Sequence, residues 1–523
     1  MSHPDPGRPP EADGQDADGG VQDAAGHGKG SAASDASARG AAASDASGPG
    51  SGAPDASGQG AAVPDAHAAG GPVETEVRRH GPSAFDALRP PSDELLADCV
   101  HCGFCLPTCP TYALWGEEMD SPRGRIYLME LASAGEIPID DIFVTHMDRC
   151  LGCMACVTAC PSGVQYDKLI EATRPQIERN HPRTAQDRWF RRLVFALFPH
   201  PRRLRAAAAL GWVYQRLRLG GLLRRSGVHQ RLPSRLRALE GLLPDVPLRA
   251  LRRRLPERVA ARGRTRRRVG LVTGCVQSVY FGDVNRATAR VLASEGCEVI
   301  VPRDQGCCGA LMEHAGEEAA ALDRARRMIA TMERADVDTV VINAAGCGST
   351  LKEYGHLLRD DADWVERARA FSAKVRDINE VLADLEPQAP RHPIPVRVAY
   401  HDACHLAHAQ RVRAQPRSVL AAIPGLDVVE LSEPEICCGS AGIYNLLEPE
   451  AAADLGVRKA ATIAAVAPDA VVTANPGCML QINRHLDPPL PMLHPVQVVD
   501  ASIAGSNPLA PHPHGAREAR RSA

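Results

Sequence analysis

Two runs of four cysteines constrain this chain more than any other feature of its sequence. The first run is Cys99, Cys102, Cys105 and Cys109, and the second is Cys150, Cys153, Cys156 and Cys160. Both have the spacing C-x2-C-x2-C-x3-C, and a proline follows each run. Thiolates spaced this closely face a common centre, and soft sulfur ligands select iron–sulfur clusters or zinc. This region therefore has to fold around bound metal.

The spacing discriminates between the two kinds of metal. It is that of bacterial ferredoxins with two 4Fe–4S clusters, in which the fourth cysteine of each run binds the other cluster. Structural zinc sites usually have cysteine pairs with a longer gap between them. We therefore expect two 4Fe–4S clusters, and prefer them to zinc, in a small helical ferredoxin domain. The apolar spacing of residues 121–137, between the two runs, predicts a helix there. The expected ligands are Cys99, Cys102, Cys105 and Cys160 for the first cluster, and Cys150, Cys153, Cys156 and Cys109 for the second.

The start of the chain and its hydropathy bear on the compartment. The first residues have neither the basic n-region nor the apolar h-region of a signal peptide. No apolar run reaches the length of about 18 residues that a membrane-spanning helix needs. A reducing cytosol also suits thiolate ligands. We predict a cytoplasmic protein, whose membrane contact, if it has one, is peripheral on the inner face of the cell membrane.

Changes in composition divide the chain into segments. Residues 1–80 contain a ten-residue Ala/Gly/Asp/Ser repeat and almost no large apolar side chains. Such a segment cannot bury enough surface to offset the entropy of ordering, so we expect a disordered tail. The remaining segments are the ferredoxin domain at 85–180 (the dicluster region), a linker segment at 181–268, two repeated domains at 269–390 and 395–503, and a tail at 504–523.

The linker segment is rich in arginine. It has 24 arginines, no lysine and four acidic residues, and apolar residues are interleaved with the charges. We weigh three interpretations: a helical linker packed on its neighbours, a surface that contacts anionic lipid, and a nucleic-acid site. The first is preferred because charged helix faces are mostly just solvated. No nucleic-acid-binding module accompanies the charge, so we expect no nucleic-acid partner.

The C-terminal half contains an internal repeat of about 130 residues. In each copy the pattern strand–helix–strand–helix–strand predicts an α/β unit with a parallel sheet, giving an α+β multidomain chain overall. The cysteines fall at the carboxyl ends of the strands, where such sheets bind ligands, and the last strand of each copy is expected to end at Cys347 or Cys478. Gly309 and Gly439 follow adjacent cysteine pairs and supply the freedom for a tight turn. The cysteines are Cys275, Cys307, Cys308 and Cys347 in the first copy, and Cys404, Cys437, Cys438 and Cys478 in the second.

Four thiolates per copy are enough for a further iron–sulfur cluster. Zinc and a vicinal disulfide are the alternatives, and the reducing compartment disfavours the disulfide. Cys297 has no counterpart in the second copy and is expected to be a buried apolar residue. His401, His405 and His408 flank Cys404. We prefer structural roles, or contacts that support the ligands, to metal ligation by these histidines, because four cysteines already complete a ligand set.

The chain resembles the iron–sulfur subunit of bacterial glycolate oxidase, also called glycolate dehydrogenase. The residues that carry the resemblance are CVHCGFCLPTCPTYALWGEEMDSPRGRIYLM, CLGCMACVTACPSGVQY, the two CCG motifs and GCGSTLKEYGHLL. The resemblance covers residues 90–500. It implies an electron-transfer subunit that takes electrons from FAD-containing partner subunits, which oxidise glycolate to glyoxylate, and passes them towards the quinone pool. No dinucleotide-binding fingerprint occurs in this chain, so we expect the isolated chain not to be catalytic.

Relatives with a similar layout serve glycerol-3-phosphate or lactate dehydrogenases, or heterodisulfide reductase, and these remain alternatives. In heterodisulfide reductase each repeat ends in C-x-x-C and binds a fused cluster. Here Thr350 and Gln481 stand where that last cysteine would be. The departure argues against the fused cluster and against disulfide chemistry.

Overall fold

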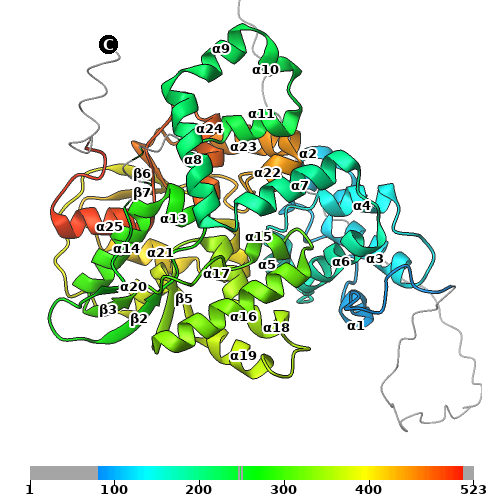
Figure 1. Ribbon diagram of the computed structural model, residues 1–523, viewed down its shortest axis with the longest axis horizontal. Coiled ribbons are helices and arrows are strands. Elements are labelled where there is room, and N and C mark those ends of the chain that lie inside the picture. Colours follow the sequence, from blue (N-terminus) through cyan, green and yellow to red (C-terminus); the bar gives the residue numbers. More distant parts are fainter. Residues whose placement is uncertain (1–80, 245–247, 249–250, 252, 511–523) are drawn as a thin grey trace, which may run out of the picture. The chain divides into compact units, whose positions relative to one another are not determined.

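The computed structural model describes residues 81–244, 248, 251 and 253–510 (Figure 1). The predicted N-terminal tail and most of the predicted C-terminal tail lie outside these residues. Everything described below belongs to one compact unit, Thr75–Ala523.

The dicluster region is helical, as predicted. The predicted helix between the cysteine runs is α3, which Pro122 begins and which the Ser121 side chain caps by accepting from the Gly124 N–H. Met129, Phe143 and Leu169 form the core of this region. Its helices are α1 (Asp93–Ala97), α2 (Pro110–Trp115), η1 (Glu118–Asp120), α3 (Pro122–Ser133), α4 (Asp141–Asp148), α5 (Ala155–Ala159) and α6 (Tyr166–Asn180).

The linker segment is helical over most of its length. Two of its helices, α7 and α11, pack on both repeats: Phe190 and Ala238 share an apolar cluster with Ala315 of the first copy and Ile443 of the second. In Figure 1, α11 lies beside α22 and α23 of the second copy. The linker helices are α7 (Ala185–Leu197), α8 (Pro201–Arg216), α9 (Leu219–Arg225), α10 (Val228–Arg231) and α11 (Ser234–Gly241).

Each repeat contains a predominantly parallel sheet, as predicted. The first sheet has the order β1-β3-β2-β4-β5 and the second β7-β6-β8-β9, and within them only the β1–β3 pair is antiparallel. The strands are β1 (Arg258–Val259), β2 (Arg267–Leu271), β3 (Cys297–Ile300), β4 (Thr339–Ile342), β5 (Val375–Asp377), β6 (Arg397–Tyr400), β7 (Asp427–Glu430), β8 (Ala470–Val472) and β9 (Met492–Leu493).

Helices cover the sheets and connect the strands. In the first copy they are α13 (Val276–Tyr280), α14 (Gly282–Ser294), α15 (Ala310–Glu313), α16 (Glu318–Ala335), α17 (Ala345–Lys352), α18 (Tyr354–Leu357), α19 (Val365–Lys374) and α20 (Ile378–Asp384). In the second they are the π-helix η2 (His405–Ala409), α21 (Ala414–Ala421), α22 (Tyr444–Leu447), α23 (Pro449–Ala464), α24 (Pro476–His485) and α25 (Pro495–Ala504).

One detail of the repeats differs from the prediction. The last strand of each copy was expected to end at Cys347 or Cys478, but it ends at Ile342 or Val472. The two cysteines lie instead at the start of α17 and α24. In the second copy the reason is Pro476, whose fixed φ favours the first position of a helix and not a strand interior.

The two copies share a hydrophobic core. Val269 and Leu271 of the first sheet belong to the same buried cluster as Val398 and Val472 of the second, and α14 packs on α25. This shared core fixes the two sheets against each other. The edges that carry the cysteines therefore have fixed positions with respect to one another.

Candidate iron–sulfur sites and the cavity between the repeats

One small cavity of the dicluster region is lined by the cysteines predicted for the first cluster. The cavity, of about 30 Å³, brings together Cys99, Cys102, Cys105 and Cys160, with Cys156 also on its wall. Cys102 is exposed to solvent. This site therefore lies at the surface of the dicluster region.

A second cavity, of about 20 Å³, is lined by Cys109, Cys150, Cys153 and Cys156. These are the cysteines predicted for the second cluster, and all four are buried. Cys150 Sγ accepts hydrogen bonds from the Gly152 N–H at 3.3 Å and from the Tyr166 hydroxyl at 3.4 Å. Donors aimed at a cysteine sulfur stabilise the negative charge that a cluster ligand carries.

A buried ion-pair network lies next to the second cavity. Asp120, fully buried, accepts from Arg125 at 3.3 Å and from Arg149 at 2.8 Å. Burial alone would raise the pKa of Cys150, but the guanidinium groups of Arg125 and Arg174 lower it below its usual value. Burial raises the pKa of Cys153 well above its usual value. A bound metal would keep the Cys153 sulfur as a thiolate. The four cysteine sulfurs of the second cavity therefore suit an iron–sulfur cluster.

The cysteines of the first copy also converge. Cys275 Sγ lies 3.6 Å from Cys307 Sγ, and the Gly309 N–H points at Cys307 Sγ from 3.4 Å. Gly309 has a φ of 91°, which supports the predicted tight turn. Two thiolates on one tetrahedral metal are about 3.8 Å apart for metal–sulfur bonds of about 2.3 Å. The sulfur spacing thus suits metal ligation.

The second copy repeats this arrangement. Cys404 Sγ lies 3.9 Å from Cys437 Sγ. Gly439 has a φ of 87°, and a Cβ there would lie 2.6 Å from the Ala452 carbonyl oxygen. Only glycine fits at this turn, for both steric and conformational reasons.

The two sets of cysteines face one cavity of about 180 Å³ between the copies. All of the repeat cysteines except Cys438 line it. His314 of the first copy and His405 of the second also line it, with ring centroids 4.9 Å apart. Phe198 and Leu242 of the linker segment lie on its wall. The sequence predicts two separate sites. It gives no sign of the shared cavity or of the linker residues that line it.

The buried site of the dicluster region adjoins the second copy. Cys153 belongs to the same apolar cluster as Cys404, Cys437 and Cys438. Thr158 also bonds the Nδ1 atom of His408 at 2.6 Å, which ties the two regions together. His408 thus has the structural role expected of it.

The structure also shows the surroundings of Cys297 and His401. Cys297 is fully buried in the shared core, as expected, and does not line the cavity. His401 was expected to have a structural or ligand-supporting role, and its ring lies beside the sulfur atoms of Cys438 and Cys478. The signal that the sequence offered was the contrast with the first copy, where a valine precedes the cysteine at the same distance.

The linker segment combines packed and exposed arginines. Arg183, Arg191 and Arg235 pair with acidic residues in the packed part. Helices α8 and α9 and the turn that joins them differ from this packed part, because exposed leucines lie among exposed arginines there. The exposed leucines are Leu210, Leu217, Leu219 and Leu222, and the arginines are Arg202, Arg203, Arg216, Arg218 and Arg225. Within the described residues, no helix has the length and apolar character needed to cross a bilayer.

Known protein families match this chain over most of the described residues. The linker region of the glycolate oxidase iron–sulfur subunit matches residues 186–243, the cysteine-rich domain matches 269–352 and 398–483, and the 4Fe–4S dicluster domain matches 95–164.

Whole proteins match as well. The probable glycolate oxidase iron–sulfur subunit of Bacillus subtilis is 41% identical over 396 residues, covering 75% of this chain and 89% of that protein. The glycolate oxidase iron–sulfur subunit of Escherichia coli is 35% identical over 414 residues, covering 78% and 93%. One fumarate reductase (CoM/CoB) subunit of Methanothermobacter marburgensis is 38% identical over 226 residues, 42% of each chain. The chain therefore belongs to the family of glycolate oxidase iron–sulfur subunits.

Proposed function

We propose that this chain is the electron-transfer subunit of a flavin-dependent complex that oxidises glycolate to glyoxylate and reduces a quinone. Oxidation of glycolate releases two electrons and two protons, and reduction of a quinone to a quinol consumes two of each. The observation that carries the proposal is the arrangement of the cysteines. One set lies at the surface, a second is buried beside it, and the second set adjoins the cavity between the repeats.

The ligand sets are part of this proposal. The first cluster would be held by Cys99, Cys102, Cys105 and Cys160, and the second by Cys109, Cys150, Cys153 and Cys156. Bound there, the clusters supply one-electron redox chemistry. We extend the proposal to the repeats, whose cysteines would hold further metal centres. This extension is supported by the distances between cysteine Sγ atoms, which are 3.6 Å for Cys275 and Cys307 and 3.9 Å for Cys404 and Cys437.

The flavin-containing partner would dock where the first cysteine set reaches the surface. Val100 and Phe104 flank Cys102 and are 68% and 67% exposed, so two apolar side chains lie in solvent next to the exposed cysteine. Phe104 also lines the first cavity. A partner that covers these side chains would bring its flavin close to the exposed cysteine set.

The quinone would be reached from the linker side of the chain. Linker residues line part of the cavity between the repeats, and the linker carries the exposed leucines and arginines of α8 and α9. Arginines attract anionic lipid and leucines enter its apolar layer, so this face suits the surface of a membrane. A peripheral contact with the inner face of the cell membrane is accordingly part of the proposal.

The test is anaerobic purification of the chain alone and with its co-purifying flavoprotein. The chain should contain at least about eight iron and eight sulfide, and more if the repeats are filled. Alone it should oxidise neither glycolate, lactate nor glycerol 3-phosphate. The complex should oxidise glycolate faster than the other two, with a dye or quinone as acceptor. Stoichiometric zinc without sulfide would refute the cluster assignment, and a preference for lactate would refute the substrate.

A further inference from the structure

His401 and Val272 occupy the same backbone position in the two copies. Each follows the central strand of its sheet and donates its N–H to the neighbouring strand at 2.9 Å, His401 to the Val472 carbonyl and Val272 to the Val341 carbonyl. Val272 is a fully buried core residue. The second copy therefore has an imidazole where the first has an apolar side chain.

The surroundings of His401 do not satisfy that imidazole. The residue is 2% exposed, and its Nδ1 atom has no hydrogen-bond partner within the described residues. A buried polar group without a partner costs about 1–3 kcal/mol, so its retention asks for an explanation.

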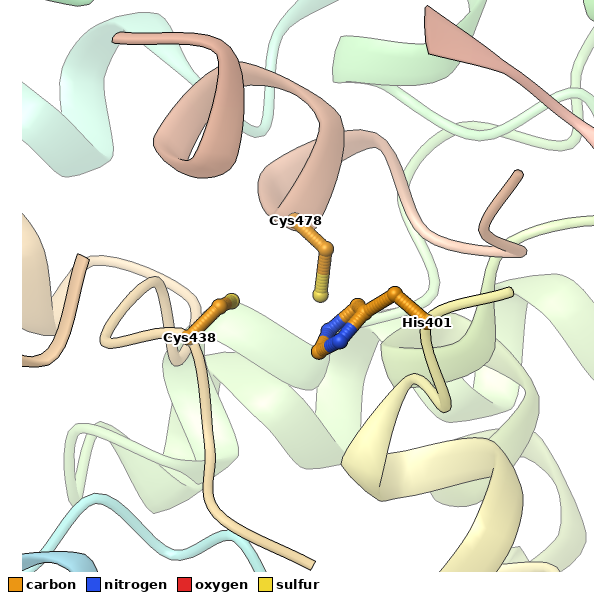
Figure 2. Close-up of side chains that lie close together, drawn as sticks. All are labelled: His401, Cys438 and Cys478. Carbon is orange, nitrogen blue, oxygen red and sulfur yellow. The ribbon is translucent and has the colours of Figure 1, made fainter. Parts of the chain in front are cut away.

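Two cysteine sulfur atoms face the ring. One nitrogen of His401 and the Sγ atoms of Cys438 and Cys478 all lie within 4.8 Å of one another. Figure 2 shows the three side chains converging from the loop after β6, the turn of the cysteine pair and the start of α24. Ligands of one tetrahedral metal lie about 3–4 Å apart, so small shifts would let one metal atom reach all three.

The residue that stands in place of a fifth cysteine is already engaged. The Gln481 amide donates to the Ala452 carbonyl at 2.7 Å, and its oxygen accepts from Asn445 at 3.1 Å. Gln481 is therefore held by protein groups. Among the described residues, His401 places a nitrogen within 4.8 Å of two cysteine sulfur atoms of this copy.

We propose that His401 is a nitrogen ligand of the metal centre held by the second copy, so that the two repeats bind chemically different centres. The inference rests on the proposed metal centre in that copy. An imidazole ligand is neutral, whereas a thiolate is negative. Replacing thiolate by imidazole raises the reduction potential of an iron–sulfur centre. If the imidazole takes the place of one of the four thiolates, the second copy is the more easily reduced of the two.

The test detects the nitrogen itself. The complex is purified anaerobically from cells fed ¹⁵N-histidine, as wild type, His401→Val, His401→Cys and His485→Gln. His401→Val installs the residue of the first copy. His485→Gln is the matched control, because that ring lies on the same helix as Cys478 and contacts the Gln481 side chain. Iron, zinc and sulfide are measured for each protein, together with circular dichroism as a check of folding.

If the centre contains iron, electron–nuclear double resonance of the reduced complex should show a strongly coupled histidine nitrogen. If it contains zinc, absorption at the zinc edge should show mixed nitrogen and sulfur ligation. Either signal should vanish in His401→Val, persist in His485→Gln, and give way to all-sulfur ligation in His401→Cys, which retains the metal even if the valine variant folds poorly.

Two results would overturn the inference. A histidine-nitrogen signal that is absent from wild type, or unchanged in His401→Val, refutes His401 as a ligand but leaves the proposed centre intact. If Cys438→Ser and Cys478→Ser together leave the metal and sulfide content unchanged, the second copy holds no metal. In that case both the centre and its histidine ligand are refuted.

Discussion

Cys109 and Cys150 line the same cavity, although they belong to different cysteine runs. Cys109 lies at the start of α2, with its Sγ atom 3.3 Å from the Thr111 hydroxyl, while Cys150 follows α4. Cys160, the last cysteine of the second run, instead lines the cavity of the first run. The exchange couples the two runs, since neither cavity is complete without the other run.

We expect Cys109→Ser to damage the centre anchored by Cys150, Cys153 and Cys156, because it removes the thiolate that crosses over. The variant should lose up to about four iron per chain and one of the two cluster signals in electron paramagnetic resonance. Cys160→Ser should remove the other signal. Cys297→Ser, in the shared core, is the control and should keep both. Loss of the same signal in both cluster variants would contradict the crossed arrangement.

We expect Arg125 to stabilise the fold around the second cavity, which is lined by Cys109, Cys150, Cys153 and Cys156. Its side chain is 1% exposed, pairs with Asp120 and lowers the pKa of Cys150. Arg125→Leu leaves the buried Asp120 charge with less compensation, and we expect a loss of about 3 kcal/mol in the free energy of unfolding. Anaerobic denaturation and iron content would measure it. Arg149→Ala removes a partner of Asp120 that is 37% exposed, so it should cost less than about 1 kcal/mol.

Membrane binding should depend on both the leucines and the arginines of α8 and α9. Replacing Leu210, Leu217 and Leu222 by serine should weaken flotation of the complex with anionic liposomes. Added salt should weaken it too, because exposed charges are screened beyond about 8 Å at physiological ionic strength. Val457→Ser is the control, since Val457 is 59% exposed on the second copy. If neither salt nor the leucine replacements change flotation, the linker does not bind the membrane and serves only to pack against its neighbours.

Asp377 should make the stability of the first copy depend on pH. It caps α20, and burial raises its pKa from 3.8 to about 7. The protonated form is therefore favoured in the folded state, and the stability it contributes is present below pH 3.8 and is lost as the pH rises to about 7.

Asparagine in this position keeps the capping acceptor and carries no charge. The free energy of unfolding of Asp377→Asn, relative to that of the wild type, should therefore rise by about 1 kcal/mol between pH 6 and pH 8. Urea unfolding at the two pH values under anaerobic conditions measures this. A difference between the two proteins that stays constant with pH would show that Asp377 is not protonated in the folded state.

The spacing of residues along the chain determined how the cysteines of the dicluster region are grouped and where several helices and strands form. The C-x2-C-x2-C-x3-C runs predicted that Cys109 lies with the second run and Cys160 with the first, and each lines the corresponding cavity. Hydrophobic patterns predicted α3 and the parallel strands of both repeats. These features depend on neighbours in sequence or on a repeated unit, so short-range periodicity is enough to find them.

Tertiary structure alone decided how those parts are combined. The two repeats turn their cysteines to one cavity, linker residues such as Phe198 line it, and Cys153 packs against the second copy. His401 meets Cys438 and Cys478 only because a strand, a turn and a helix start come together. Such contacts join residues far apart in sequence. They are set by the burial of apolar surface in a shared core, which no local spacing encodes.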